Sequence, residues 1–453
     1  MQPFRYHAFI CNQEKPEGIP SCTAHGSKPV IDLFRKEVAA QGLTDKVQIT
    51  ACGSFGLCEW GPNMIVYPDG IWYCGVGEKD VAEIVREHFQ NDRPVKRLIK
   101  ENADQVRAEI KSNAALHYAA MEAQEKAGML PFDLQGRIRS FMASRAILTA
   151  VELDVFSQVG NGASAAEVAK KIDTNPRATE KLLNALVALD LLTKKAERFQ
   201  NTPVASRFLS ADGKDDSRAA IMHSVNLWKR WTTLSDCVRK GTSVTFEPME
   251  ERDDGWTVSF IAAMHKNASF RARQIVATIG VDGVKRVLDV GGGSGAYSIA
   301  FVQARDDIHS DIFDLSTVVP LARKYAAAAG VSERVGFKVG DMQKDDLGNG
   351  YDLVLLSAIC HMFSVEENEL LLRKCFKALN PGGRIAIQDF ILEPDKTSPQ
   401  TAALFALNML VGTPGGSAYS EGDYFAWLKA IGFGNLERKR LPGPTGLIIG
   451  RRP

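Results

Sequence analysis

The sequence lacks long apolar runs and an excess of charge of either sign. No apolar run approaches the roughly 20 residues that a membrane-spanning helix needs. The first residues, Met1-Gln2-Pro3-Phe4-Arg5-Tyr6-His7, lack the apolar core of a signal peptide. The 55 lysines and arginines balance 54 aspartates and glutamates, so no basic surface for nucleic acid or an anionic membrane is expected. We therefore expect a cytoplasmic protein that binds neither nucleic acid nor membrane, and 453 residues suggest about three domains.

Cysteine is scarce over most of the chain but concentrated near its beginning. Five of the eight cysteines are Cys11, Cys22, Cys52, Cys58 and Cys74. Dense cysteine without a secretion signal indicates metal binding rather than disulfides. The absence of a C-x-x-C knuckle disfavours zinc.

Residues 1–100 predict a first α/β unit. Apolar runs predict strands near residues 4–10 and 47–50 and a hairpin over 64–73, and helical periodicity appears over 30–38 and 81–89. The charged, alanine-rich stretch that follows predicts a helical linker over residues 101–134.

Residues 135–250 read as helical with one small β-wing. A capped helix is predicted to begin near Ala163-Ser164, and apolar residues continue at helical spacing over 178–186. Residues 198–201 suggest the wing of a winged-helix unit. Because no recognition helix is strongly basic, an interface role is favoured over DNA binding.

A glycine-rich turn after residue 290 is the most informative motif. Residues 286–290 predict a buried strand that runs into Gly291-Gly292-Gly293-Ser294-Gly295. A backbone without Cβ atoms lets a nucleotide-like ligand lie against a strand-to-helix turn. The pattern Gly291-x-Gly293-x-x-Ala296 also fits a permissive dinucleotide motif, so this turn alone is ambiguous.

The strands that follow end in side chains suited to a nucleoside. The strand over 310–313 ends in Asp314, where a carboxylate can bind ribose hydroxyls. The next strand is followed by Asp341 and Met342, which suit an adenine amino group and ring face. The predicted cofactor residues are Asp289, Gly291, Gly293, Asp314, Leu315, Asp341 and Met342.

Six motifs in a fixed order resemble one known class of enzyme. They occupy residues 144–156, 286–295, 313–315, 340–342, 381–383 and 405–410. Together they resemble the S-adenosylmethionine-dependent class I methyltransferases, in particular small-molecule O-methyltransferases related to the acetylserotonin, hydroxyneurosporene and bacteriochlorophyllide enzymes. The resemblance implies a Rossmann-like α/β domain over residues 251–453, a winged-helix-like dimerisation domain over 135–250, a homodimer, and a small aromatic or polycyclic acceptor.

The same resemblance implies a catalytic histidine. His361 falls at the position of the family's base, and Asp389 matches the acid that orients it. A neutral imidazole, with a pKa of about 6.5, suits removal of a hydroxyl proton while a sulfonium methyl group is transferred in line. Packing of His361 at a strand end is the structural alternative. Met362 and Ala418 stand where plant members carry acids, which leaves C- or S-methylation open.

Six residues are candidates for the acceptor pocket, although aromatic and methionine residues at such spacing are also typical of ordinary core. They are Trp228, Trp231, Phe405, Asn408, Met409 and Thr413.

The first unit resembles the thioredoxin-like [2Fe–2S] ferredoxins. Cys11, Cys22 and the segment 56–73 agree with that family. The resemblance implies a cluster with four ligands, namely Cys11, Cys22, Cys58 and, at the third position along the chain, either Cys52, which is favoured, or Ser54, with Cys74 as a spare. It also implies a redox partner.

We therefore expect a methyltransferase that favours O-methylation and carries an iron–sulfur module for redox control or electron delivery. Two alternatives remain. One is a redox-sensing or binding protein with a vestigial methyltransferase fold. The other is an oxidoreductase that acts on a ligand in the C-terminal pocket.

Overall fold

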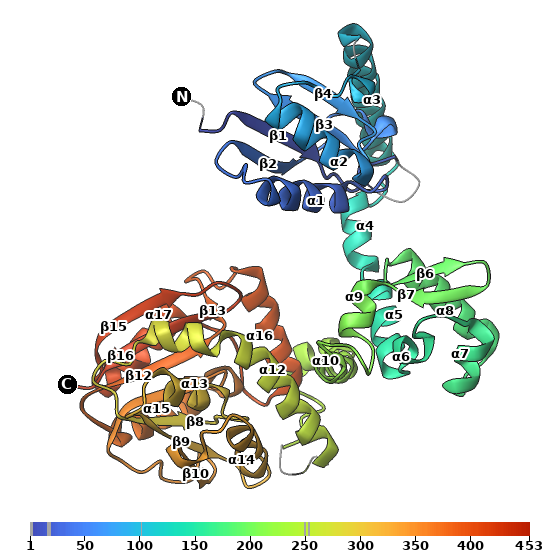
Figure 1. Cartoon of the computed structure of the whole chain (residues 1–453). Helices are drawn as coiled ribbons and strands as arrows, with labels where there is room; N and C mark the ends of the chain where they lie inside the picture. Colours follow the sequence, from blue (N-terminus) through green and yellow to red (C-terminus); the bar gives the residue numbers. More distant parts are fainter. Residues whose placement is uncertain (1–2, 16–19, 101, 249–250, 252–253) are drawn as a thin grey trace. The chain divides into compact units, whose positions relative to one another are not determined.

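Two units make up the chain, Met1–Met142 and Ala143–Pro453, and Figure 1 shows the course of the chain through each of them. The computed structural model describes residues 3–15, 20–100, 102–248, 251 and 254–453. The domain boundaries predicted at 100/101 and 250/251 lie next to residues outside this set. None of the described helices is long and apolar enough to cross a membrane.

A four-stranded mixed sheet forms the centre of the first unit. Its order is β2-β1-β3-β4, with β1 parallel to β2 and β3 antiparallel to both β1 and β4. Phe34 and Tyr73 lie in its core and are shielded from solvent. The elements are β1 (Tyr6–Cys11), α1 (Ser27–Ala40), β2 (Val47–Cys52), the 3-10 turn Cys58–Trp60, β3 (Asn63–Tyr67), β4 (Ile71–Cys74) and α2 (Glu78–Ile84).

Strands β3 and β4 confirm the predicted hairpin, but the helix predicted over residues 81–89 differs from the structure. Helix α2 begins at Glu78 because the Asp80 carboxylate accepts the Gly77 N–H at 2.8 Å and closes the first turn. The helix then changes to a π-helical turn over Val85–Gln90.

Helix α3 (Ala103–Lys126) lies within the stretch predicted as a helical linker and is followed by α4 (Phe132–Arg139). The Asn102 side chain caps α3 by accepting the Gln105 N–H at 3.0 Å. These helices leave several large apolar side chains exposed, namely Leu116, Tyr118, Met121, Leu134 and Ile138.

Short helices and a three-stranded sheet of order β5-β7-β6 form the first part of the second unit. Ser164 and Glu167 exchange hydrogen bonds of 2.7 and 3.3 Å in a capping box, which confirms the predicted helix start. Strands β6 and β7 form the predicted wing. The elements are α5 (Phe141–Glu152), α6 (Val155–Val159), β5 (Ala163–Ser164), α7 (Ala165–Lys171), α8 (Pro176–Ala188), β6 (Leu192–Lys195), β7 (Arg198–Asn201) and α9 (Pro203–Phe208).

A seven-stranded sheet of order β10-β9-β8-β11-β12-β16-β15 dominates the rest of the second unit. The strands from β10 to β12 are parallel, whereas β16 is antiparallel to β12 and β15. The strands are β8 (Arg286–Val290), β9 (His309–Asp314), β10 (Val335–Val339), β11 (Tyr351–Ser357), β12 (Leu379–Asp389), β15 (Gly434–Arg440) and β16 (Gly446–Arg451), and the short β13 (Ile391–Leu392) pairs with β14 (Tyr419–Ser420). The helices are α10 (Arg218–Trp231), α11 (Leu234–Lys240), α12 (Asp254–Ile279), α13 (Ala296–Ala304), α14 (Val319–Ala328), α15 (Val365–Ala378), α16 (Gln400–Gly412) and α17 (Glu421–Ile431).

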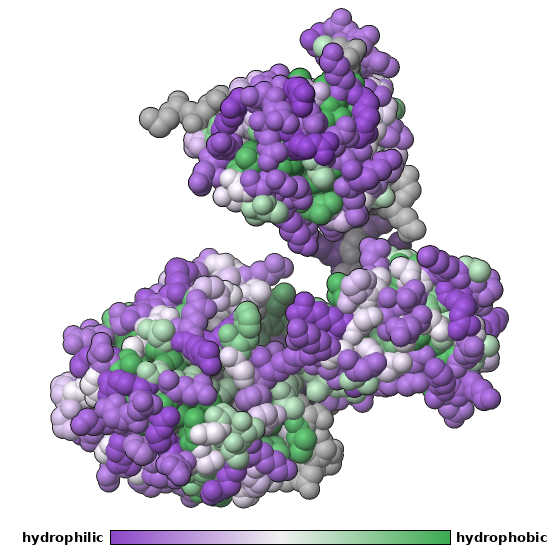
Figure 2. Space-filling model, viewed as in Figure 1, coloured by the Kyte–Doolittle hydropathy of each residue, from purple (hydrophilic) through white to green (hydrophobic). Residues whose placement is uncertain are grey.

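This sheet is covered on both faces, which explains the continuous apolar runs of its strands. Leu288 and Leu356 pack on the face covered by α15 and α17. Val287 and Leu355, one residue away, pack on the face covered by α12, α13 and α14. Hydrophilic residues cover most of the surface that Figure 2 shows, with hydrophobic residues in small patches.

The strand order reverses at the centre of the sheet. The chain proceeds from β8 to β9 and β10 on one side, and then to β11 and β12 on the other. Ligands of open α/β sheets bind at the carboxyl ends of the strands beside such a reversal. A ligand site is therefore expected at the carboxyl ends of β8, β9, β11 and β12.

Candidate active site

The glycine-rich turn follows β8 at the centre of the sheet. Gly291 and Gly293 have φ values of +66° and +57°, in the left-handed region that favours glycine. A Cβ atom on Gly291 would lie 2.9 Å from Cε of Met342 and would also overlap Ile359. The turn thus brings together Gly291 and Met342, two of the predicted cofactor residues.

Asp314 joins this turn to the end of β9. Its Oδ2 accepts the Gly293 N–H and its Oδ1 accepts the Leu315 N–H, both at 2.8 Å. Burial raises the pKa of Asp314, and the two backbone hydrogen bonds oppose that shift. Because each carboxylate oxygen can accept two hydrogen bonds, each retains one acceptor position.

Asp289 lies beneath the turn and is closed off from solvent. Its Oδ2 accepts the Ser298 hydroxyl at 2.8 Å, and Ser298 in turn accepts the Ser310 hydroxyl at 2.9 Å. Its Oδ1 has no hydrogen-bond partner among the described residues. Burial raises the pKa of Asp289 to about 6, so the neutral acid persists in the folded protein up to a higher pH than in the unfolded chain.

We expect Asp289 to make the stability of the ligand-free protein depend on pH. The carboxyl has a pKa of 3.8 when unperturbed and about 6 in the folded state, so the folded state binds more protons between these values. The free energy of unfolding should therefore fall as pH rises through this window, by about 3 kcal/mol. Asp289→Asn should remove most of that fall, measured by urea unfolding at both ends of the window. Asp282→Asn, at an exposed position, is the control; an unchanged pH dependence in Asp289→Asn would contradict this assignment.

Asp341 and Met342 follow β10 in a tight turn. The Asp341 carboxylate accepts the Gln343 N–H at 2.8 Å and pairs with Lys344 at 2.8 Å. Lys374 holds the same turn by donating to the Met342 and Gln343 carbonyls at 3.0 and 2.7 Å. Asp341 therefore already has partners in the turn, whereas the Met342 side chain reaches Gly291.

His361 and Asp389 form a buried pair at the same edge of the sheet. His361 lies in the turn after β11, and Asp389 ends β12. Nδ1 of the His361 ring lies 2.6 Å from Oδ1 of Asp389, and the backbone N–H of His361 donates to Oδ2 of Asp389 at 3.1 Å. The histidine side chain is 10% exposed and the aspartate side chain 0%. Because a carboxylate only accepts, Nδ1 carries the hydrogen and Nε2 of the neutral ring is left able to take a proton.

The surroundings of this pair include the two departures from the plant pattern. Ala418 is buried and Met362 is exposed, so neither position supplies an acid. The Tyr424 hydroxyl instead donates to Oδ2 of Asp389 at 3.4 Å.

Helix α16 brings part of the predicted acceptor pocket to His361. The Phe405 ring meets the His361 ring edge-on at 4.8 Å and stacks on Phe390 at 3.8 Å. Asn408 accepts the indole N–H of Trp231 at 2.9 Å. Trp228 lies one turn before Trp231 on α10 and is partly buried.

Met409 and Thr413 are buried at the end of α16. The Thr413 hydroxyl donates to the Met409 carbonyl at 2.8 Å and accepts the Gly416 N–H at 2.9 Å. Its polar contacts therefore serve the turn that follows the helix.

Helix α12 supplies contacts to the glycine-rich turn that the sequence did not reveal. Nδ1 of His265 lies 2.9 Å from the Ser294 hydroxyl, and the His265 ring stacks on Tyr325 at 3.8 Å. Burial lowers the pKa of His265. Since His265 lies on a distant helix, no local pattern connects it to the turn.

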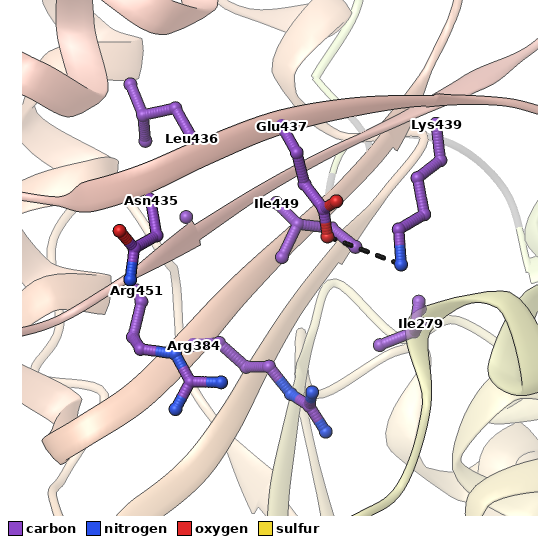
Figure 3. Close-up of a pocket in the computed structure, with 9 residues that line it drawn as sticks. Ile279, Arg384, Asn435, Leu436, Glu437, Lys439, Ile449 and Arg451 are labelled. Carbon is purple, nitrogen blue, oxygen red and sulfur yellow. Dashed lines mark ion pairs between the residues drawn. The ribbon is translucent and has the colours of Figure 1, made fainter.

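A separate pocket of about 410 Å³ opens beside β12, β15 and β16. Figure 3 shows Arg384 and Arg451 near one side of it and the Glu437–Lys439 ion pair near the other. Arg384 precedes Asp389 by five residues on β12, about 16 Å along the strand. This pocket therefore lies toward the other end of the sheet from His361.

The four predicted cluster ligands lie near one end of the N-terminal sheet. Cys11 and Cys52 end the neighbouring strands β1 and β2 and face each other in register. A hydrogen bond from the Cys22 thiol lowers the pKa of Cys11. The Ser54 hydroxyl lies 3.4 Å from Sγ of Cys58. Within the described ranges, no group of three or more His, Cys, Asp or Glu side chains is arranged to hold a metal ion.

The sheet topology, the glycine-rich turn and the histidine–aspartate pair define an α/β class I methyltransferase with a helical dimerisation domain. Residues 231–434 match an O-methyltransferase domain, and residues 137–211 match an O-methyltransferase dimerisation domain. The chain belongs to the O-methyltransferase family, whose members use S-adenosylmethionine. These two matches leave residues 1–136 uncovered.

Three known proteins illustrate the similarity. The 3-hydroxy-5-methyl-1-naphthoate 3-O-methyltransferase of Streptomyces sahachiroi is 32% identical over 68% of this chain and 91% of its own length. The acetylserotonin O-methyltransferase of Bos taurus is 27% identical over 69% of this chain and 95% of its own. The solved structure "PigF with SAH" has a TM-score of 0.66 at 27% identity, over 72% of this chain and 100% of its own.

Proposed function

We propose that this enzyme transfers the methyl group of S-adenosylmethionine to an oxygen of a small aromatic or polycyclic acceptor, with His361 as the base. The observation that supports this most directly is the buried His361–Asp389 pair, 2.6 Å apart, at the sheet edge that also bears the glycine-rich turn. Asp389 fixes the ring so that Nε2 can take the hydroxyl proton. The acceptor oxygen then bonds to the methyl carbon as the carbon–sulfur bond breaks.

The residues around the glycine-rich turn fit the cofactor. When bound, the cofactor supplies a methyl group activated by a positively charged sulfur. Asp314 retains one acceptor position on each oxygen, which suits two ribose hydroxyls. Met342 suits the face of the adenine ring. We assign the cofactor site to Asp289, Gly291, Gly293, Asp314, Leu315, Asp341 and Met342.

The relatives support an aromatic acceptor. The names of two of them specify a naphthoate and acetylserotonin, both methylated on oxygen. We assign Phe405, Asn408 and Trp231 to the wall nearest His361. We place Trp228, Met409 and Thr413 behind that wall.

The test is to incubate the full chain with S-adenosylmethionine carrying an isotope-labelled methyl group and a panel of hydroxylated aromatic acids and phenols. Label in an aryl methyl ether, identified by mass spectrometry and NMR, is the expected result. Label on carbon or sulfur of the acceptor would show that the enzyme catalyses C- or S-methylation instead of O-methylation. Cofactor binding without methyl transfer to any acceptor would favour a redox-sensing or binding protein with a vestigial methyltransferase fold. Reductant-dependent acceptor consumption with the cofactor's methyl group left in place would favour an oxidoreductase.

We propose that the N-terminal unit is a thioredoxin-like module that holds a [2Fe–2S] cluster. The mixed sheet of order β2-β1-β3-β4 supports the fold assignment. The soft thiolates of Cys11, Cys22, Cys52 and Cys58 suit iron. Because Cys52 faces Cys11 across the strand pair, we favour it over Ser54 as the third ligand. The module would control methyl transfer or exchange electrons with a redox partner.

Anaerobically purified protein is expected to contain about one two-iron cluster per chain. Iron and acid-labile sulfide are measured together with the visible absorption spectrum. Cys52→Ser should lose the cluster, while Cys237→Ser, in the second unit, should keep it. A cluster retained in Cys52→Ser would favour Ser54 or Cys74. Protein made with ample iron that contains neither iron nor sulfide would reject the cluster.

The dimerisation domain supports a homodimer. We propose that the protein is a homodimer. A cytoplasmic location remains part of this proposal.

A further inference from the structure

One face of α16 leads from His361 to an arginine of α10. Phe405, Asn408 and Gly412 are spaced by three and four residues and therefore lie along one side of the helix. Phe405 contacts His361, and Asn408 binds Trp231. A Cβ atom on Gly412 would lie 3.5 Å from Nη1 of Arg230. At about 1.5 Å per residue, this stripe is about 10 Å long.

The Arg230 guanidinium is partly buried, and none of the described acidic residues contacts it. Among the described residues, no hydrogen bond or ion pair within 4 Å is formed by its side chain. Glu247 is the acidic residue that acts on it electrostatically, and burial nevertheless lowers the pKa of Arg230. On the same helix, Arg218 pairs with Asp154 and Asp216 at 2.7 and 3.1 Å.

A desolvated cation without a contacting anion is costly, and a bound anion would remove that cost. The planar guanidinium fork matches a carboxylate, which it can bind through two parallel hydrogen bonds. The length of the α16 stripe matches a fused acceptor of two or three rings, with its hydroxyl near His361 and its acidic group near Arg230.

We propose that Arg230 recognises a carboxylate on the aromatic acceptor and thereby selects acidic over neutral acceptors. This inference rests on the proposed function, because it places the acceptor between His361 and Arg230. It extends that function by naming the acceptor class as aromatic hydroxycarboxylic acids.

A purely structural role for Arg230 makes a different prediction. The guanidinium lies near the C-terminal end of α16, where a positive charge stabilises the helix. In that role, Arg230→Gln would lower the melting temperature of the protein and weaken the binding of all acceptors equally. Arg230→Lys, which keeps the charge, would then restore both the melting temperature and the binding of acceptors.

The experiment compares a hydroxynaphthoate with the naphthol that lacks its carboxylate. Binding of each to the full chain, saturated with S-adenosylhomocysteine, is measured by calorimetry for wild type, Arg230→Gln, Arg230→Lys and the exposed neighbour variant Lys229→Gln. We expect Arg230→Gln to weaken hydroxynaphthoate binding by about 10- to 100-fold and naphthol binding by less than about threefold. Arg230→Lys should restore part of the loss, and Lys229→Gln should resemble wild type.

Equal affinity of the wild type for both acceptors, or equal losses on both in Arg230→Gln, would overturn the inference. The binding measurement does not depend on methyl transfer. Discrimination by Arg230 without any transfer would therefore contradict the proposed chemistry and leave the inference standing. Methyl transfer to the naphthol and to the hydroxynaphthoate with equal kcat/KM would support the proposed chemistry and contradict the inference about Arg230.

Discussion

Replacing His361 by alanine is expected to lower kcat by about 10²- to 10⁴-fold, the usual contribution of a positioned general base. The variant loses the Nε2 atom that takes the hydroxyl proton, while the glycine-rich turn and Asp314 keep their contacts with each other. The dissociation constant of S-adenosylhomocysteine should therefore stay within about twofold of the wild-type value. Single-turnover kinetics and calorimetry measure the two quantities separately.

Two further variants make this result specific. Asp389→Asn should also lower kcat, because an amide in place of the carboxylate can present an N–H to Nδ1 and leave the hydrogen of the neutral ring on Nε2. His309→Ala, at an exposed position where β9 begins, should keep full activity. Near-normal turnover in His361→Ala would mean that alignment of the acceptor suffices without a base.

The strands around the candidate site were predictable because each is a short apolar run that ends at a recognisable residue. The strands predicted before Gly291, Asp314 and Asp341 correspond to β8, β9 and β10. Burial on both faces of the sheet makes such runs continuous, and the glycine turn marks the centre of the sheet. Local sequence was therefore enough to place these residues at one edge.

Contacts between distant elements were not predictable in the same way. His265 reaches Ser294 from a helix, and Tyr424 reaches Asp389 from the last helix. Each depends on how α12 and α17 cover the sheet, and no spacing within either helix specifies it. Thr413 shows the converse: its position suggested a pocket, whereas its hydroxyl serves the turn that follows α16.

The N-terminal unit shows how topology and ligand geometry differ in predictability. Alternating apolar residues indicated the strands that deliver Cys11 and Cys52. The approach of several thiolates within bonding distance of one ion depends on loop conformations, which the ligands themselves help to fix. The sequence could therefore name four cysteines, whereas the described residues place Cys11 beside Cys52 and show no preformed metal site.

Replacing Asp314 by alanine is expected to weaken S-adenosylhomocysteine binding by about 10- to 100-fold, equivalent to about 1.5–3 kcal/mol for a hydrogen bond to a charged group. The carboxylate has two functions at this position. It accepts the Gly293 and Leu315 N–H groups, which fixes the turn, and it retains one acceptor position on each oxygen for ribose hydroxyls. The affinity is measured by calorimetry, and thermal unfolding shows whether the variant is still folded.

The two functions of Asp314 can be separated by comparing variants and ligands. Asp314→Asn keeps the shape of the side chain but places an amide N–H group where one acceptor oxygen was, so it should lose most of the same affinity. Asp346→Ala, in the exposed loop after β10, should bind like the wild type. If Asp314 binds ribose, a cofactor analogue without the 2′-hydroxyl should bind wild type more weakly and lose much less on going to Asp314→Ala, because the missing hydroxyl and the missing carboxylate remove the same contact. Unchanged affinity in Asp314→Ala, or additive losses with the analogue, would remove Asp314 from the ribose site and leave it as a residue that fixes the turn.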